Sequence, residues 1–113
     1  MGGIYLYAGT TNGLFRSPDC FCGWTKVTKF FDSATIYALT VHPYDSKIIL
    51  ASIRDGIYRS EDGGATWERF SKGLGKDPIG ALAFSADAKS VYAVDVTGIV
   101  YKSTDLDSWT RVK

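Results

Sequence analysis

Short segments of apolar and aromatic residues, separated by turn residues, run along the whole chain. Polar side chains interrupt the apolar ones in Ile57–Ser60 and in Trp67–Phe70, which is typical of strands with one wetter face. Ile36–Val41, in contrast, is apolar nearly throughout. The segments are rich in β-branched and aromatic residues, about five to eight residues long, and bounded by Gly, Asp, Ser or Pro. The pattern predicts β-strands joined by tight turns, and no helix.

Five landmark residues recur three times along the chain. An Ala, a Gly, a Ser, an Asp and a Trp return after 43 residues and again after a further 42 to 43. The three sets are Ala8, Gly13, Ser17, Asp19 and Trp24; Ala51, Gly56, Ser60, Asp62 and Trp67; and Ala93, Gly98, Ser103, Asp105 and Trp109. Ile36–His42 also returns, as Ile79–Ser85, at the same spacing. We therefore expect a single domain, 1–113, with repeats at approximately 4–30, 35–73 and 78–113.

Each complete repeat is expected to contain four strands. A period of about 43 residues with four antiparallel strands is the arithmetic of a β-propeller blade. The continuous apolar segment Ile36–Val41 would then be the innermost strand of a blade, buried on both sides. The predicted fold class is all-β, with propeller blades of four antiparallel strands. A β-sandwich of consecutive hairpins is the alternative.

A recurring loop joins the third and fourth strands of each repeat. It consists of Ser, any residue, Asp, a few loop residues and Trp, and its most complete version is Ser60–Trp67. The Ser hydroxyl and the Asp carboxylate can accept hydrogen bonds from backbone N–H groups, and paired glycines permit the positive φ values of a tight loop. The tryptophan offers a large apolar face to a neighbouring sheet and an indole N–H to a carbonyl. The loop is thus expected to be a self-sufficient structural device.

Ser60–Trp67 resembles the Asp-box, also called the bacterial neuraminidase repeat. The matching positions of the three copies are Ser17, Asp19 and Trp24; Ser60, Asp62, Gly64, Thr66 and Trp67; and Ser103, Asp105 and Trp109. The family includes sialidases, xyloglucan-type glycoside hydrolases, sortilin-like receptors and photosystem II assembly factors. Ala38–Trp67 looks most like the repeats of the xyloglucan hydrolases and the assembly factors. The resemblance implies a propeller in which the box lies remote from the active face. Cys20–Gly23 and Leu106–Ser108 depart from the pattern, so distorted loops are expected there.

The number of expected strands raises the question of how the propeller closes. From Tyr5 the chain supplies three strands of one blade and then two complete blades, which makes eleven strands, or about two and three quarter blades. Propellers typically close with about four to eight blades, and an open arc exposes apolar faces and strand edges. A homodimer of about six blades is the favoured hypothesis. A truncated piece of a longer propeller and a monomeric open arc are the alternatives.

Composition and charge exclude several classes of protein. The 113 residues are 45% apolar, and 13 Lys and Arg against 12 Asp and Glu give a net charge of +1, which argues against disorder and against nucleic-acid or polybasic membrane binding. No apolar run approaches the roughly 18 to 20 residues of a membrane span. The first residues lack the features of a secretory signal, so a cytoplasmic location is slightly favoured.

The two cysteines do not predict a disulfide, a metal site or a redox site. Cys20 and Cys22 are separated by one residue, too short a loop for an unstrained disulfide. Zinc requires four ligands, and His42 is the only histidine of the sequence. We expect unpaired loop thiols and neither a metal nor a cofactor.

Candidate ligand-binding residues lie on the face expected to be opposite the boxes. They are Arg54, Asp55, Asp95 and Tyr37. Asp55 and Asp95 are also the one plausible carboxylate pair for a glycosidase. Each residue has a structural alternative: both aspartates occupy turn or strand-end positions, Arg54 and Asp55 can form a solvated ion pair, and Tyr37 can fill the propeller centre.

These observations favour a binding or scaffolding module without catalysis of its own. Its expected ligand is a carbohydrate or a protein segment, and its expected partner is a second copy of itself. The alternative is a subunit or fragment of a glycoside hydrolase, similar to a sialidase or xyloglucanase. A third hypothesis is a purely structural unit whose only activity is self-association.

Overall fold

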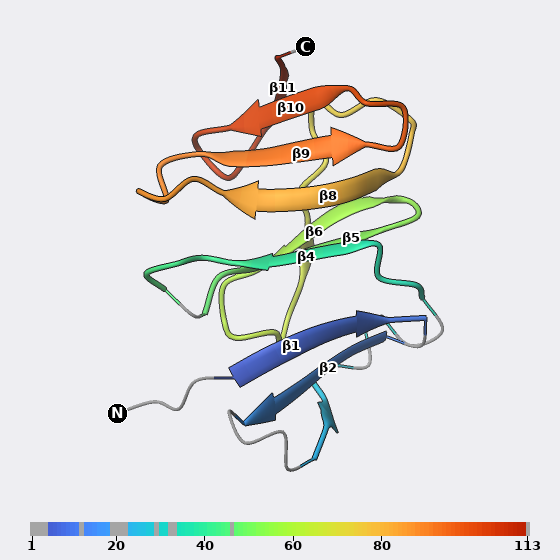
Figure 1. The fold of residues 1–113 in the computed structure, drawn as a ribbon, viewed down its shortest axis with the longest axis vertical. Coiled ribbons are helices and arrows are strands. Elements are labelled where there is room, and N and C mark those ends of the chain that lie inside the picture. Colours follow the sequence, from blue (N-terminus) through green and yellow to red (C-terminus); the bar gives the residue numbers. More distant parts are fainter. Residues whose placement is uncertain are drawn as a thin grey trace.

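In the part of the chain that the structure describes, eleven strands form three antiparallel sheets, which follow one another along the long axis of the molecule (Figure 1). The computed structural model describes residues 5–11, 13–18, 23–28, 30–31, 34–45 and 47–112. We name the sheets blades 1, 2 and 3 in chain order. Blade 1 contains β1 (Tyr5–Thr10), β2 (Gly13–Pro18) and β3 (Thr25–Lys26). Blade 2 contains β4 (Ala38–Val41), β5 (Ile49–Ile53), β6 (Gly56–Ser60) and β7 (Glu68–Arg69). Blade 3 contains β8 (Ile79–Phe84), β9 (Val91–Asp95), β10 (Val100–Ser103) and β11 (Thr110–Arg111).

Each blade is a meander in which every strand pairs with the next one along the chain. The described residues contain no helix, and therefore none that could cross a membrane. Two four-stranded sheets and one three-stranded sheet confirm the predicted all-β fold and its two and three quarter blades. Ala8 of β1 pairs with Phe15, and Ala51 of β5 pairs with Tyr58, so β1 and β2 are the equivalents of β5 and β6. Among the described residues, blade 1 therefore has no counterpart of β4 and β8.

Two hydrophobic cores fill the spaces between neighbouring blades. The core between blades 1 and 2 contains Leu14, Phe31, Ile36, Ile49, Ala51 and Trp67. The core between blades 2 and 3 contains Leu50, Ile57, Phe70, Ile79, Val91, Ala93, Tyr101 and Trp109. Residues 49, 50 and 51 of β5 go alternately to the two cores, as the period of two in a strand requires.

The most buried strand is β5, not β4. The sequence predicted that Ile36–Val41 would be buried on both sides, but β4 is only half-buried along its whole length. In β5, Ile49–Ser52 are all buried. The difference arises because β4 is an edge strand with a single neighbour in its sheet, whereas β5 lies between β4 and β6 and is covered on both faces by other blades.

Polar side chains add cross-links between blades 2 and 3. The buried Ser52 hydroxyl donates to the carbonyl oxygen of Ile79 at 2.7 Å. The guanidinium of Arg59 donates to the carbonyl oxygen of Leu106, and its carbon lies 5.6 Å from the centre of the Phe70 ring. These bonds satisfy polar groups at the interface, so the two sheets are held in one register.

Candidate functional site

The second box loop, Ser60–Trp67, is held by its own side chains. The Ser60 hydroxyl accepts the N–H of Gly64 at 2.9 Å and donates to Asp62 at 2.8 Å. The Asp62 carboxylate also accepts the N–H and the hydroxyl of Thr66, at 2.9 and 2.5 Å. The indole N–H of Trp67 donates to the carbonyl of Gly64 at 2.9 Å. Side chains and backbone of the loop thus satisfy one another's hydrogen bonds.

The third box loop, Ser103–Trp109, uses the same plan with poorer geometry. Asp105 accepts the N–H groups of Asp107 and Ser108 at 3.0 and 3.1 Å, and Ser103 donates to Asp105 at 3.3 Å. Leu106 has a φ of 55°, in the left-handed region, where the second loop has glycines. The predicted distortion at Leu106–Ser108 is thus present.

The first box loop is described only in part. Ser17 is buried at the end of β2, and Trp24 is 46% exposed. Asp19, Cys20 and Cys22 lie outside the described residues. The predictions made for them therefore stay predictions.

Asp62 is expected to make folding stability depend on pH in the acid range. Hydrogen bonds from the side chain and backbone of Thr66, and from Ser60, lower the pKa of Asp62 from 3.8 to about 2. Because the folded pKa lies below the unfolded one, this stabilisation is present above about pH 4 and is lost as the pH falls toward about 2.

The measurement is the free energy of unfolding between neutral pH and about pH 2, for the wild type and for Asp62→Asn. The variant is expected to lose less stability over the acid window than the wild type. It should not become independent of pH, because hydrogen bonds also lower the pKa values of Asp87, Asp95 and Asp105. Equal acid slopes in the two proteins would contradict the prediction.

The turn between β5 and β6 lies at the opposite end of β6 from the second box loop. The turn consists of Arg54 and Asp55, which precede β6, while the box loop follows Ser60. A cleft of about 440 Å³ opens beside the turn. Its lining residues come from the connection between blades 1 and 2 and from the turn: Ala34, Thr35, Tyr37, Ile53, Arg54 and Asp55. The structure thus brings Tyr37, Arg54 and Asp55 together on the predicted face.

A second, smaller cleft lies on the other side of the same turn, between blades 2 and 3. Its volume is about 230 Å³. Its charged lining residues are Arg54, Asp55, Arg69, Lys76 and Asp77. Arg54 and Asp55 therefore stand between two clefts and line both of them.

The ion-pair partner of Asp55 is Arg69, not Arg54. The Arg69 guanidinium lies 3.9 Å from the Asp55 carboxylate and donates to the Asp55 carbonyl oxygen at 2.6 Å. The Tyr58 hydroxyl donates to the same carboxylate at 3.2 Å, and burial, together with the negative charge of Asp55, raises the pKa of Tyr58. Arg54 is exposed and forms no ion pair with any residue of the described ranges. Its guanidinium is available at the edge of both clefts.

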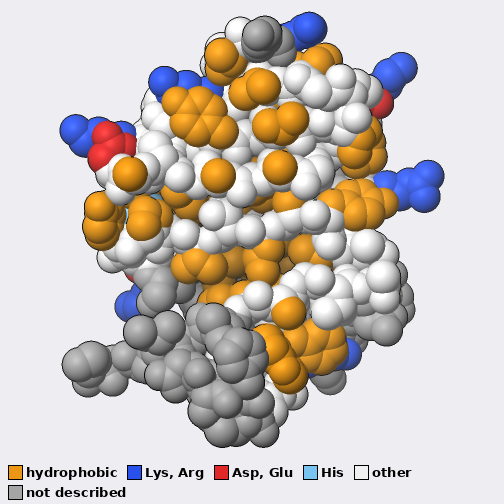
Figure 2. All heavy atoms as spheres, viewed as in Figure 1, with side chains coloured by type: hydrophobic (Ala, Val, Ile, Leu, Met, Phe, Trp, Pro, Cys, Tyr) orange, Lys and Arg blue, Asp and Glu red, His pale blue; other side chains and the backbone are white. Residues whose placement is uncertain are grey.

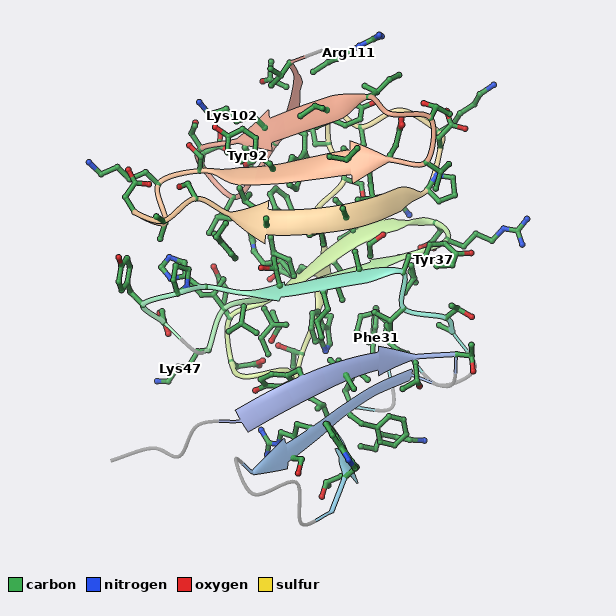
Figure 3. The ribbon with its side chains drawn as sticks, in the orientation of Figure 1. Phe31, Tyr37, Lys47, Tyr92, Lys102 and Arg111 are labelled. Carbon is green, nitrogen blue, oxygen red and sulfur yellow. The ribbon has the colours of Figure 1, made fainter. Side chains whose placement is uncertain are left out.

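Tyr37 forms part of the wall of the larger cleft. It is 41% exposed, and Figure 3 shows it near the connection that leads into β4. The exposed ring gives the cleft an apolar surface beside the charge of Arg54.

Asp95 lies apart from these residues and holds a turn. Its side chain is only 5% exposed, and one carboxylate oxygen accepts the N–H and hydroxyl of Thr97 and the N–H of Ile99, at 2.8, 2.6 and 3.0 Å. The hydrogen bond from the Thr97 hydroxyl lowers the pKa of Asp95, with smaller contributions from backbone N–H groups. Asp95 belongs to neither cleft beside Arg54.

Arg69 is a residue of the candidate site that the sequence did not predict. Arg69 is exposed on the outer strand β7, where a charged residue is ordinary. The proximity of Arg69 to Asp55 follows from the register of β6 with β7. Tyr58 pairs with Arg69, and a two-residue turn places Asp55 just before β6. Only the strand pairing brings Arg69 next to Asp55.

Comparisons with known proteins identify the type of blade. No protein-family model matches the chain. A xyloglucanase from Paenibacillus sp. is 32% identical over 88 residues, covering 57% of this chain and 9% of that protein. Vacuolar protein sorting/targeting protein 10 from Pyricularia oryzae is 30% identical over 105 residues, covering 90% of this chain and 6% of that protein. The chain spans less than a tenth of the length of these curated relatives.

Solved structures show the same fold. The GH74 enzyme from Niastella koreensis superposes with a TM-score of 0.82 at 21% identity, over 95% of this chain and 19% of its own. An ancestral GH74 enzyme gives 0.75 at 22% identity, over 96% and 17%. YCF48 from Cyanidioschyzon merolae gives 0.59 at 20% identity, over 71% and 24%. The chain is thus an all-β segment of propeller blades. Its blades share the fold of those of GH74 enzymes and YCF48, and part of its sequence is similar to a xyloglucanase, which confirms the resemblance to this family of propeller repeats.

Proposed function

We propose that the chain is a non-catalytic binding module whose ligand site is the pair of clefts around Arg54 and Asp55. The observation that carries the proposal is the meeting of Arg54, Asp55 and the exposed ring of Tyr37 at one cleft. Concave sites that combine apolar surface with a few convergent polar groups are the usual form of small-ligand sites.

A carbohydrate is the ligand class that these side chains favour. The exposed Tyr37 ring offers a flat apolar surface for the C–H face of a sugar ring. Arg54 offers several N–H donors, and Asp55 offers acceptor oxygens, for the surrounding hydroxyl groups. The similarity to proteins named as xyloglucanases supports the same class. A protein segment is the second ligand class to be screened.

The test is binding of xyloglucan oligosaccharides, measured by calorimetry, with a peptide array as a second screen. Arg54→Ala is expected to weaken binding by about ten- to a hundredfold, since hydrogen bonds from charged groups contribute about 1.5–3 kcal/mol. Arg111→Ala is the matched control, because Arg111 is an exposed arginine on β11 and lines neither cleft (Figure 3). Unchanged binding by Arg54→Ala would place the site elsewhere.

The alternative function, a piece of a glycoside hydrolase, is favoured by the matches to xyloglucanases. Such chemistry uses two carboxyl groups separated by about 5–10 Å across a cleft. Asp55 lines both clefts, whereas Asp95 is occupied by its turn. Hydrolysis of the same oligosaccharides that disappears in Asp55→Asn would support the enzyme over the binding module.

A further inference from the structure

The two contacts between neighbouring blades use residues at equivalent positions of the repeat. One residue just after the outermost strand of each blade donates its N–H to the strand before it, at 2.7 to 2.9 Å: Val27 to Leu14, Phe70 to Ile57, and Val112 to Val100. In blades 1 and 2 this residue packs in the core that contains the box tryptophan of the following blade. Trp109 stacks on Phe70 at 4.8 Å and donates its indole N–H to the Phe70 carbonyl at 2.9 Å. Trp67 shares a core with Val27 and donates its indole N–H within its own loop, to Gly64.

Val112 and Trp24, the remaining residues at these two repeated positions, are exposed. Val112 occupies the position of Val27 and Phe70 but is 57% exposed. Trp24 occupies the position of Trp67 and Trp109 in the sequence repeat, and it is 46% exposed where they are 8% and 4% exposed. The chain therefore carries both halves of one further contact, at opposite ends of its array of blades.

The face of blade 3 that points away from blade 2 repeats the covered face of blade 2. Tyr92 takes the position of Leu50, and Lys102 that of Arg59. Leu50 is fully buried under blade 3, whereas Tyr92 is 37% exposed. Apolar side chains gather over β8, β9 and β10 in Figure 2, and Figure 3 shows Tyr92 and Lys102 together there.

Lys102 takes the strand position from which Arg59 reaches the next blade. Its ammonium lies 5.8 Å from the centre of the Tyr92 ring, whereas the guanidinium of Arg59 lies over the ring of Phe70, whose counterpart in blade 3 is Val112. Arg59 donates from this position to a carbonyl in the box loop of blade 3. From the same strand position, the Lys102 ammonium can donate a hydrogen bond to a carbonyl of a blade that covers Tyr92.

The face of blade 1 that points away from blade 2 has residues equivalent to those of blade 3 that pack on blade 2. Ala8 and Phe15 pair across β1 and β2 and are partly buried. Their equivalents in blade 3, Ala93 and Tyr101, are almost fully buried against blade 2. Ala8, Phe15 and Trp24 therefore form a surface of the kind that covers a preceding blade. Tyr92 and Val112 belong to a surface of the kind that is covered.

We propose that the outer face of blade 3 binds blade 1 of a second copy of this chain, head to tail. Trp24 of one copy packs on Val112 and Tyr92 of the other, as Trp109 packs on Phe70 within the chain. The second copy is the occupant because the same sequence carries both complementary faces, and because a net charge of +1 opposes association only weakly. A repeated head-to-tail contact closes into a ring when its rotation fits, and two copies supply about six blades, within the usual range for propellers.

The test is the solution mass, measured by light scattering on a sizing column over a range of concentrations. The wild type is expected at twice the 12.4 kDa of one chain. Val112→Arg is expected to weaken association at least about a hundredfold, because it places an unpaired charge in the contact. Val96→Arg is the matched control: Val96 is 65% exposed, in the turn after β9, outside the proposed contact. It should leave the mass unchanged.

Complementation provides the decisive comparison. Trp24→Ala damages one half of the contact and Val112→Arg the other, so each is expected to be a monomer. A one-to-one mixture retains one intact contact and is expected to show a larger mean mass than either variant alone. Circular dichroism verifies that both variants are folded.

A monomeric wild type, or association that survives both variants, would overturn the proposal. Because ligand binding at Arg54 is measured separately, a monomer that still binds the oligosaccharides would refute this contact and leave the proposed site standing.

Discussion

Replacing Trp109 with alanine is expected to lower the free energy of unfolding by about 3–5 kcal/mol. The side chain is 4% exposed and stacks on Phe70, and its indole N–H donates to the Phe70 carbonyl across the interface of blades 2 and 3. Alanine leaves a cavity in this core and a buried carbonyl without its donor. Urea denaturation followed by circular dichroism measures the loss.

Trp109→Phe separates the two contributions and serves as a milder variant. It keeps an aromatic ring over Phe70 but removes the indole donor. We expect a loss of about 1–3 kcal/mol, the usual cost of one unsatisfied buried polar group, plus the smaller loss in ring area. If Trp109→Ala and Trp109→Phe were equally stable, the packing role assigned to this residue would be wrong.

Replacing Gly73 with alanine is the second substitution with a large expected effect. Gly73 has a φ of 95°, and a Cβ built there collides with the carbonyl oxygen of Trp109. The backbone N–H of Trp109 donates to the carbonyl oxygen of Lys72 at 2.7 Å, so the close approach of these two backbone segments is part of the contact between blades 2 and 3. The atoms in the way belong to the Trp109 backbone, which cannot change rotamer to make room as a flexible side chain can. The loss of unfolding free energy therefore combines strain of about 1–3 kcal/mol with an overpacking cost of similar size.

Gly98→Ala is the matched control for Gly73→Ala. Gly98 has nearly the same φ, 97°, but nothing lies within 4 Å of an added Cβ. This variant should lose only the strain contribution, about 1–3 kcal/mol. The difference between the two midpoints in urea then reports the collision with Trp109. Equal losses would show that the backbone near Trp109 adapts.

Much of the candidate site could be predicted because its signals are local. Arg54 and Asp55 are adjacent in the sequence, in a two-residue turn set by Gly56, and the meander fixes the side of the blade on which they lie. The ion pair of Asp55 with Arg69 could not be predicted, because 14 residues and the register of β6 with β7 separate the two side chains. Asp95 has the same residue type as Asp55, and only its hydrogen bonds to Thr97 and Ile99 reveal its different role.

The blades, their four-stranded plan and the box loops could all be predicted from the order of residues. These features follow from short-range physics: alternation along a strand, turn residues, and side chains that bind N–H groups two to four positions away. Which strand is fully covered, which charge pairs with Asp55, and which faces are exposed could be seen only in the packed sheets. Those outcomes depend on how separate sheets pack. The exposure of Trp24 and Val112, against the burial of their equivalents, exists only once three blades are stacked.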